Sequence, residues 1–228
     1  MISPIFKVFV KLSKMISRKG IYKFLSQAFS SIKQSEQVLF IGAGGEIHDL
    51  LKEYQKRNGF NVTSFDIDDK RNPDIKGDIC TFDFGDSQYD VVVMAEVLEH
   101  LHSPHLAIDN VYSILRPKGN LIITVPFIFP IHDRPYDYFR YTRYGLQHLL
   151  RKFQEVFIKE RNSWTETINV LFVRHIMNEN ISSKIVAPIF IVFAFVILPF
   201  AVLLSCIIKS DYITSGYLAS AIKHRVDN

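Results

Sequence analysis

A glycine-rich turn and an aspartate follow the first two apolar runs in the middle of the chain. Gly42 and Gly44 stand in the turn Gly-Ala-Gly-Gly, and Asp66 ends the next apolar run, 24 residues after Gly42. Glycine lets the backbone turn tightly and approach a bound molecule. A carboxylate at the tip of the neighbouring strand can accept hydrogen bonds from both hydroxyls of a ribose. Together they predict a site for an adenosine-containing cofactor, whereas Asp68 and Asp69 are expected to be solvated loop acids.

The turn lacks one feature of a dinucleotide site. In the pattern Gly-x-Gly-x-x-Gly the last position is small, so that helix and strand can pack closely. Counted from Gly42, that position is Ile47, which is bulky. We therefore expect a cofactor without a pyrophosphate, and a nicotinamide-dependent oxidoreductase is disfavoured.

A second set of ionisable residues lies in the string Glu-Val-Leu-Glu-His at 96–100. On a helical turn, residues at i, i+3 and i+4 share one face, so Glu96, Glu99 and His100 can converge on a proton or a divalent cation. The alternative is that Glu99 and His100 cap and brace the loop beneath the cofactor. We favour this bracing role, expect no bound metal, and keep His100 as an acid–base candidate.

These residues fall between short apolar runs that alternate with helical stretches. The unbroken apolar character of the runs is typical of strands buried on both faces of a parallel sheet. The intervening stretches are long enough for crossover helices. The pattern therefore predicts an α/β, doubly wound sheet. The expected strands are 38–41, 61–65, 91–95 and 121–125, and the expected helices are 46–56 and 105–115.

Basic charge is concentrated at the start of the chain. The 228 residues include 27 Lys or Arg and 23 Asp or Glu, for a net charge of +4. Residues 1–35 hold seven of the basic residues and no acidic one. A basic arm on a slightly acidic body is not the distribution of a nucleic-acid-binding protein and fits an anionic membrane surface better. Because Cys80 and Cys206 are the two cysteines of the sequence, a disulfide framework and a cysteine-built zinc site are excluded.

Residues 2–18 have the pattern of an amphipathic helix. Lys7, Lys11, Lys14 and Arg18 fall on one face, apolar residues fall on the other, and Gly20 ends the pattern. This helix either lies on a membrane surface or caps the main domain, and the sequence favours neither. A second apolar stripe, at 21–33, is expected to be a cap. The apolar face of the first helix consists of Ile2, Ile5, Phe6, Phe9, Leu12 and Ile16.

The segment 185–208 contains 24 residues without a charge. That length is enough for a membrane segment. A buried core helix is the less favoured alternative, because core helices seldom lack a polar face over such a length. Lys184 and Lys209 flank the segment, and Pro199 offers a break near its middle.

Five segments of the chain resemble, in order, the motifs of class I S-adenosylmethionine-dependent methyltransferases. The match covers roughly residues 36–160. It implies a Rossmann-like, mostly parallel seven-stranded sheet whose last strand is antiparallel to its neighbours. The matching segments are 38–45, Asp66, 77–79, 89–100 and 115–121.

The resemblance also implies how the cofactor, S-adenosyl-L-methionine, would be held. Gly42 and Gly44 would let the backbone approach its methionine part. Asp66 would bind the ribose hydroxyls. Asp78 would accept a hydrogen bond from the adenine amino group, and Ile79 would pack on the adenine ring.

Two further positions bear on this cofactor site. Glu96 would lie at the mouth of the fourth strand, near the methyl donor. The family commonly has an acidic residue two positions before the first glycine, where this chain has Phe40. Because that carboxylate normally supports the glycine turn, its loss lowers the expected affinity for the cofactor without changing the expected fold.

The segment 125–142 follows the fifth expected strand. From His132 onward it combines an imidazole, two carboxylates, two guanidiniums and four aromatic rings. Ligands bind beyond the carboxyl ends of parallel strands, so this segment either faces the methyl acceptor or forms a packed lid. Aromatic rings can stack on sugars, and arginines can pair with phosphates. For a hydroxyl acceptor His132 is the expected general base, because a neutral imidazole near pH 7 suits that task.

The same segment resembles a methyltransferase branch associated with bacterial surface-polysaccharide synthesis. The sequence therefore predicts an S-adenosylmethionine-dependent O-methyltransferase at the cytoplasmic face of a membrane. Its expected partners are membrane lipid and a lipid-linked saccharide or another amphiphile, with no nucleic acid. The Glu-x-x-Glu-His string is also similar to quinone-type O-methyltransferases, so a quinone or lipid-headgroup methyltransferase is one alternative. A non-catalytic membrane-bound module that retains the fold is the other.

The resemblance bears on how the apolar segment meets a membrane. It implies that 154–160 and 217–222 form the last two strands, one before and one after the apolar segment. Two full crossings need about 40 residues, more than the 24 of this segment. We therefore expect a broken helical hairpin that dips into one leaflet. The expected domains are N-terminal helices (1–35), a methyltransferase core (36–164), an insertion with the apolar segment (165–212) and a closing strand with a tail (213–228).

Overall fold

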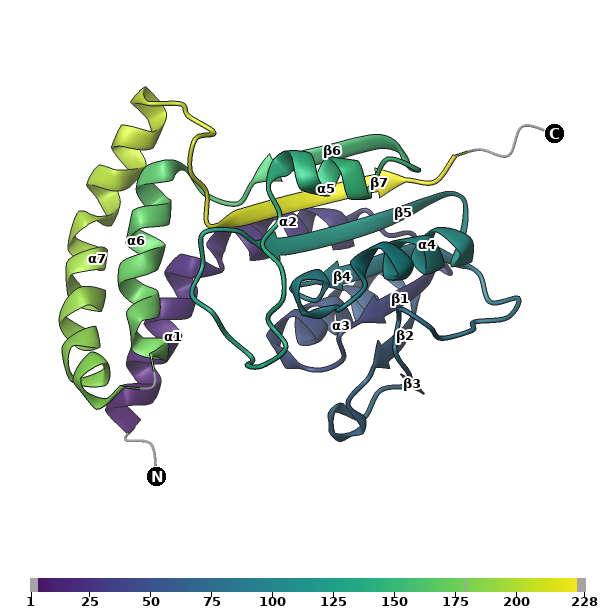
Figure 1. The fold of residues 1–228 in the computed structure, drawn as a ribbon, viewed down its shortest axis with the longest axis horizontal. Helices are drawn as coiled ribbons and strands as arrows, with labels where there is room; N and C mark the ends of the chain where they lie inside the picture. The colour runs from purple at the N-terminus through teal and green to yellow at the C-terminus, as the bar shows by residue number, and fades with distance from the viewer. Residues whose placement is uncertain (1–3, 179, 225–228) are drawn as a thin grey trace. The chain divides into compact units, whose positions relative to one another are not determined.

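Seven strands form one mixed sheet in the order β3-β2-β1-β4-β5-β7-β6 (Figure 1). The computed structural model describes residues 4–178 and 180–224. The α/β, doubly wound sheet predicted from the apolar runs is confirmed, and β3 is the strand that those runs missed. The strands are β1 (Gln37–Ile41), β2 (Asn61–Asp66), β3 (Ile75–Lys76), β4 (Tyr89–Ala95), β5 (Leu115–Pro126), β6 (Gln154–Glu160) and β7 (Gly216–Ile222).

The strand order reverses on the two sides of β1. β1 pairs in parallel with β2, where Ile41 lies opposite Phe65, and with β4, where Ile41 lies opposite Met94. The chain first adds β2 and β3 on one side and later adds β4 and β5 on the other. In open sheets of this kind, ligands bind outside the carboxyl ends of the strands at the reversal. The ends of β1 and β4 are therefore where a cofactor site is expected.

β7 lies between β5 and β6 and runs antiparallel to β5. At one end, the amide of Lys118 donates to the carbonyl of Lys223 over 3.2 Å; at the other, the amide of Phe127 donates to the carbonyl of Ser215 over 2.9 Å. The strands expected at 154–160 and 217–222 are confirmed, including the return of the chain to the sheet after the apolar segment.

The helices around the sheet begin and end at ordinary local signals. α3 ends at Gly59, whose φ of 75° is left-handed. α4 has Pro104 in its first turn, and the hydroxyl of Thr142 caps α5 by accepting from the amide of Gly145. The helices expected at 46–56 and 105–115 are confirmed. These helices are α2 (Lys19–Ser30), α3 (Gly45–Asn58), α4 (Pro104–Ile114) and α5 (Arg143–Leu149).

The chain forms two compact units, and neither is a continuous stretch of sequence. Among the described residues, unit 1 comprises 4–23, 127–131 and 160–216 apart from 179, and unit 2 comprises 24–126, 132–159 and 217–224. Nearly all of the sheet belongs to unit 2, whereas unit 1 is mainly helical.

Unit 1 is built around three helices that pack side by side (Figure 1): α1 (Pro4–Ser17), α6 (Trp164–Arg174) and α7 (Ile181–Ile207). α6, which the sequence analysis did not predict, begins with a capping box between Ser163 and Glu166. The cluster that holds the helices together consists of Ile16, Val170, Val173, Ile176, Ala187, Ile191 and Ala194.

α7 is one continuous helix of 27 residues, with Pro188 and Pro199 inside it. The break expected near Pro199 is therefore wrong. α6 holds α7 on both sides of this proline. The Asn169 amide donates to the Ala194 carbonyl over 2.9 Å, and the Thr165 hydroxyl donates to the Ala201 carbonyl over 2.8 Å. These hydrogen bonds keep the two halves of α7 in line, although proline removes a backbone donor.

The apolar face expected on α1 packs within unit 1. Phe6, Phe9 and Leu12 lie against the apolar cluster that includes Ile16, while Ile2 lies outside the described residues and the side chain of Ile5 is not described. The apolar face of α1 thus packs on α6 and α7 within unit 1. α1 ends at Ser17, before the end expected at Gly20, and Gly20 lies in the first turn of α2, where a Cβ would be 2.2 Å from the carbonyl oxygen of Arg161.

Candidate active site

The glycine turn between β1 and α3 has the backbone that only glycine adopts readily. Gly42 and Gly44 have φ values of 96° and 81°, in the left-handed region that disfavours other residues. A Cβ at Gly42 would lie 2.6 Å from the Val97 side chain, whereas a Cβ at Gly44 would meet nothing within 4 Å. Gly42 is therefore fixed by close packing, and the space beside Gly44 is open to a ligand.

His48 supports this turn from inside α3. Its Nδ1 accepts a hydrogen bond from the amide of Gly44 over 3.0 Å, and its ring stacks on Phe40 with centroids 4.8 Å apart. Burial lowers the pKa of His48, and the neighbouring Lys52 lowers it further. The neutral imidazole can act as an acceptor. The support that a family carboxylate gives at position 40 comes here from His48, packed on Phe40.

Asp66 lies at the carboxyl end of β2, beside the turn in the sheet order. One of its oxygens accepts from the amide of Asp68 over 2.8 Å, and the other lies 3.7 Å from Nε of Arg71. Arg71 also donates to the carbonyl of Ala43 over 3.1 Å, which links this carboxylate to the glycine turn. The side chain of Asp66 is largely buried, so its orientation is fixed before any ligand binds.

Asp78 follows β3 at the same edge of the sheet. It accepts a hydrogen bond from the amide of Cys80 over 2.9 Å and lies 3.4 Å from Nε2 of His102. Burial alone would raise the pKa of Asp78, but the hydrogen bonds from Cys80 and His102 outweigh burial and lower it. Ile79 is buried, and its carbonyl accepts from Asn110 over 3.0 Å.

Glu96 ends the central strand β4 in a strained conformation. Its φ of 56° is left-handed, which is uncommon for a residue other than glycine and is concentrated at functional sites. Its carboxylate accepts a hydrogen bond from the Thr124 hydroxyl over 2.9 Å, and its amide donates to the Thr124 carbonyl over 2.9 Å. Two strands thus hold the Glu96 side chain at the carboxyl edge of the sheet.

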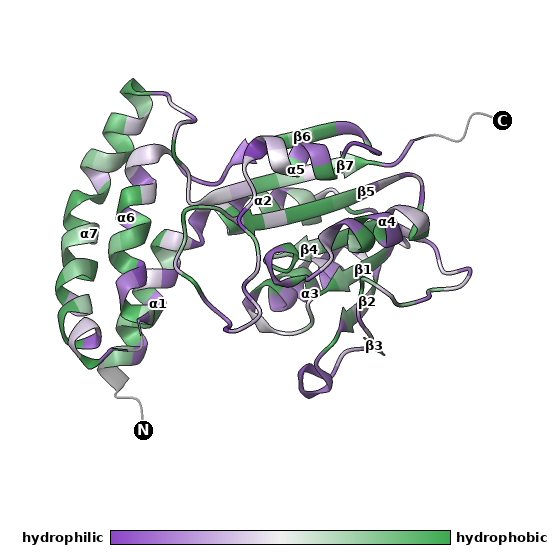
Figure 2. Ribbon diagram, viewed as in Figure 1, coloured by the Kyte–Doolittle hydropathy of each residue, from purple (hydrophilic) through white to green (hydrophobic). Residues whose placement is uncertain are grey.

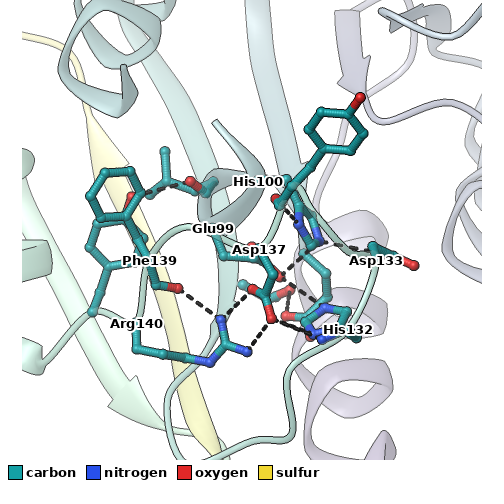
Figure 3. A network of polar contacts seen from close by, with 12 residues as sticks. Glu99, His100, His132, Asp133, Asp137, Phe139 and Arg140 are labelled. Atoms are coloured by element: carbon teal, nitrogen blue, oxygen red, sulfur yellow. Dashed lines mark hydrogen bonds and ion pairs between the residues drawn. The ribbon is translucent and has the colours of Figure 1, made fainter. Parts of the chain in front are cut away.

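A network of charged side chains joins the segment after β5 to the turn after β4 (Figure 3). Nδ1 of His132 lies 3.3 Å from Asp137, and Nε2 of His132 lies 3.9 Å from Glu99. Arg140 approaches Asp137 from another side, with Nη2 donating over 2.7 Å. The Glu99 side chain is fully buried. The imidazole of His132 therefore lies next to two carboxylates, one of which is also paired with a guanidinium.

Asp137 stays ionised in this network. Burial alone would raise its pKa, but the hydrogen bonds from Arg140 and from the His132 amide outweigh burial and lower the pKa to about 2. An ionised Asp137 favours the tautomer of His132 that carries its proton on Nδ1. It also stabilises a positive charge on that ring.

The segment is anchored to the short helical turn η2 (Leu98–His100). The amides of Tyr138 and Phe139 donate to the carbonyl of Glu99 over 3.0 and 3.2 Å, and the Tyr141 hydroxyl donates to the Leu98 carbonyl over 3.1 Å. Burial raises the pKa of Tyr141, and the charge of Glu99 raises it further. The backbone carbonyl of Glu99 thus braces the segment after β5.

His100 lies beside His132, and their rings meet edge to face with centroids 5.0 Å apart. Nδ1 of His100 is 2.8 Å from the Tyr136 carbonyl, and Nε2 is 3.7 Å from Glu99 and 3.8 Å from Asp133. The structure therefore brings together both histidines that the sequence singled out, although 31 residues of chain lie between them.

Among the residues that the structure describes, two groups of side chains have the donor types and spacing to hold a cation. Glu99, His100 and His132 offer ligand atoms within 4.8 Å of one another, a donor set that divalent metals accept. Glu96 is outside this group, so Glu96, Glu99 and His100 do not converge on one cation, the less favoured of the two alternatives. The second group is Asp78, Cys80 and His102.

Four residues of this site were missed by the sequence analysis in these roles. They are His48, Thr124, Asp137 and Arg140. The segment 125–142 was singled out as a whole, and the pair Asp137–Arg140 has the i, i+3 spacing that brings side chains together. The roles of Thr124 and His48 depend on contacts with residues of other segments. No local sequence pattern indicates those contacts, so the sequence could not predict these roles.

The family of the chain can now be stated. The sequence profile described as "Methyltransferase domain" matches residues 15–163, which is well over half of the sequence. The chain belongs to this methyltransferase family. The matched range includes the glycine turn, the strand ends and the histidine network.

Solved structures share the fold of this methyltransferase at low sequence identity. Phosphoethanolamine N-methyltransferase 2 of Haemonchus contortus is 12% identical with a TM-score of 0.57, covering 91% of this chain and 53% of its own. The methyltransferase chain thus spans about half of that enzyme. A SAM-dependent methyltransferase from Archaeoglobus fulgidus is 18% identical with a TM-score of 0.58, covering 91% and 95%. No curated protein sequence matches significantly.

The same fold also occurs in a protein named for another reaction. The [4+2]-cyclase SpnF is 12% identical, with a TM-score of 0.59 over 90% of this chain and 82% of its own. Similarity at this level establishes the fold alone, so the reaction must be argued from the family and from the side chains of the site.

Proposed function

We propose that this methyltransferase transfers a methyl group from S-adenosyl-L-methionine to a hydroxyl oxygen of a sugar-bearing amphiphile, such as a lipid-linked saccharide. The proposal depends on one observation, the imidazole of His132 held 3.3 Å from the ionised carboxylate of Asp137. The family gives the reaction class. This imidazole adds a means of removing the proton from a hydroxyl, which an oxygen acceptor requires and an amine does not.

The residues at the carboxyl edge of the sheet fit the cofactor. The open space beside Gly44 suits its methionine part, the oriented carboxylate of Asp66 suits ribose hydroxyls, and Asp78 suits the adenine amino group. When bound, S-adenosyl-L-methionine supplies a methyl group on a positively charged sulfur. Glu96, held by Thr124, adds a negative charge at the same edge of the sheet.

His132 performs the proton transfer in the proposed step. It accepts the hydroxyl proton of the acceptor while the acceptor oxygen bonds to the methyl carbon and the bond from that carbon to sulfur breaks. The products are a methyl ether, the neutral sulfide and protonated His132. Asp137 remains ionised and stabilises the positive charge on the ring, in the manner of the carboxylate in a hydrolase triad. Solvent then takes the proton from His132.

Exposed aromatic rings near His132 in sequence support a sugar-bearing acceptor. Tyr136, Tyr138 and Phe139 are 61%, 47% and 38% exposed. Such rings offer flat apolar faces with which sugars stack. The resemblance to a polysaccharide-synthesis branch and the exposed apolar surface of α7 support an acceptor with both a sugar and a lipid part.

The test is methyl transfer from methyl-labelled cofactor to a lipid extract of the native membrane, with saccharide and lipid fractions counted separately. His132→Ala should lower the rate by roughly 10²–10⁴ because it removes the general base. His105→Ala, which changes an exposed histidine in the first turn of α4, should leave the rate unchanged. A rate within a few-fold of wild type for His132→Ala would remove His132 from the mechanism.

Calorimetry separates the cofactor from the chemistry. Asp66→Ala should weaken cofactor binding at least tenfold, because hydrogen bonds to a charged group contribute about 1.5–3 kcal/mol, whereas His132→Ala should not. Unchanged affinity for Asp66→Ala would contradict the cofactor site. A rate that falls with a chelator and returns with a divalent metal would assign His132 to a metal instead. Cofactor binding without transfer to any fraction would favour a non-catalytic module.

A further inference from the structure

The two ends of the helical segment 161–216 are fastened to each other inside unit 1. The amide of Arg161 donates to the carbonyl of Gly216 over 2.9 Å, and the Ser215 hydroxyl donates to the Asn162 carboxamide oxygen over 2.5 Å. The amide of Asn162 is 3.4 Å from the hydroxyl of Thr214. Both ends of the segment must therefore lie on the same side of any membrane that the segment touches.

α6 runs antiparallel along α7 between these fastened ends. Thr165 contacts Ala201, Asn169 contacts Ala194, and Phe172 stacks on Phe190 at 5.8 Å. α6 has 11 residues, which as a helix extend about 17 Å, too short for a hydrocarbon core of about 30 Å. α7, with 27 residues, is long enough to cross alone. Because α6 cannot form the second crossing, a crossing α7 would separate ends that are hydrogen-bonded.

α7 nevertheless presents a wide apolar surface to its surroundings. Within the described residues it is the one helix long and apolar enough to cross a membrane, and only 17% of its most apolar part is buried. Hydrophobic residues colour α7 along nearly its full length (Figure 2). The exposed large apolar side chains of α7 are Ile181, Ile185, Val186, Ile189, Val192, Phe193, Val196, Phe200, Val202, Leu203, Leu204 and Ile207.

Apart from Val202, which is 36% exposed, these side chains share one face of α7. At 100° per residue they fall within an arc of about 140°. Ala187, Ile191, Ala194 and Ala201, which are buried, fall on the opposite side, where α6 and α1 pack. The two sides of α7 therefore differ in burial and not in polarity. The exposed apolar side, called the open face, extends from one end of the helix to the other.

Unit 1 is strongly basic. Its sequence ranges hold ten Lys or Arg and four Asp or Glu, a formal charge of +6, so the remainder of the chain carries −2. Three of the lysines, Lys7, Lys11 and Lys14, project from α1, the helix that packs beside α7, and Lys7 and Lys11 are exposed. An apolar helix face with cationic neighbours is the combination that binds anionic lipid surfaces.

We propose that unit 1 binds the surface of an anionic lipid bilayer, with α7 lying in the plane of the interface and its open face among the acyl chains. The lysines of α1 then contact lipid headgroups, and neither α6 nor α7 crosses the bilayer. The inference concerns unit 1 alone and holds whatever reaction unit 2 catalyses.

Flotation of the full-length protein with phosphatidylcholine vesicles, with and without phosphatidylglycerol, tests this surface. Wild-type protein should float with the anionic vesicles. Val196→Glu with Phe200→Glu should abolish flotation, because both side chains are exposed on the open face. Phe157→Glu, a matched change at a side chain 53% exposed on β6, should float as wild type. Cofactor binding by calorimetry should be unchanged in each variant, which separates lost lipid binding from a lost fold.

Charge and topology are tested separately. Changing Lys7, Lys11 and Lys14 to Gln should weaken binding to anionic vesicles by about 100-fold, at about fivefold for each charge, without affecting binding to neutral vesicles. Cys206 and a second thiol introduced by Asn180→Cys, at the exposed N-cap of α7, mark the two ends of the helix. Both thiols should react with an impermeant reagent from the side to which protein was added. Reaction from opposite sides, absence of flotation, or a dimer that α7 substitutions dissociate would each overturn the proposal.

Discussion

Asp137 joins the guanidinium of Arg140 to the imidazole of His132, and its side chain is only 2% exposed. Asp137→Asn keeps the shape but removes the charge that fixes the His132 tautomer. We expect turnover to fall about ten- to 100-fold, because a hydrogen bond to a charged group contributes about 1.5–3 kcal/mol, with the cofactor dissociation constant unchanged. Single-turnover kinetics and calorimetry on the same preparation measure both. A parallel loss of cofactor affinity would contradict the assignment of this network to the acceptor side.

His48 predicts a pH dependence for the glycine turn. Its folded-state pKa is lowered from 6.5 by burial, so the unfolded chain binds this proton more readily than the folded protein. Stability and cofactor affinity should therefore be complete above pH 6.5 and fall as the pH decreases below it, because protonated Nδ1 cannot accept from Gly44. His48→Asn offers an acceptor that does not titrate. Melting temperatures from pH 7 to 5 should fall more steeply for wild type, and parallel curves would contradict the role of His48.

At the scale of elements, the turn between β1 and α3 is held by packing against the turn that follows β4. Gly42→Ala adds a Cβ 2.6 Å from Val97 to a backbone with φ of 96°. Left-handed backbone alone costs about 1–2 kcal/mol for alanine, and the close contact adds to it. Thermal unfolding should show a lower melting temperature for Gly42→Ala and partial recovery when Val97→Ala is added. No recovery would mean that backbone strain alone is responsible.

The elements that the sequence predicted are those whose signals are local. β1, β2, β4 and β5 follow from unbroken apolar runs, and α3 and α4 follow from the length of the stretches between those runs. β3 has two residues and α5 has seven, too few for periodicity to register. α6 was missed because the face that it buries includes polar residues, so it lacks a clear apolar stripe. Thr167 and Asn169 on this face are fully buried. The continuity of α7 through Pro199 depends on its packing against α6. The sequence of α7 alone therefore could not predict that the helix continues through this proline.

At the scale of the whole molecule, the helical segment and the sheet are joined where Arg161 and Gly216 are hydrogen-bonded. Replacing 163–213 with a short Gly-Ser linker, and removing residues 1–18, should therefore leave β6 and β7 joined by a tight connection. We expect this variant to bind the cofactor, unfold in one transition and no longer float with vesicles. A chain that stops after Glu160 is the control, because it also lacks β7. Loss of cofactor binding in the linker variant would show that unit 2 needs unit 1.

The candidate site was predicted in its parts and not in its arrangement. Gly42, Asp66 and Asp78 are positioned by strand ends, which a parallel sheet gathers at one edge, so their grouping followed from the order of the runs. His132 meets Glu99 because the segment after β5 folds back on η2 through the amides of Tyr138 and Phe139. These contacts join residues about forty positions apart in the sequence. They involve backbone atoms, so no side-chain type in the sequence indicates them.

The place of β7 between β5 and β6 has a consequence for synthesis. Residues 161–215 leave the ribosome after β6 and before β7, which takes about 3–10 s at 5–20 residues per second. Throughout that interval β5 and β6 have an unfilled position between them, and α7 is complete before β7 has been made. The most apolar helix of the nascent chain is thus made before the sheet can close. Completion of the sheet therefore requires a single strand to enter a gap that has stayed open during the synthesis of α6 and α7.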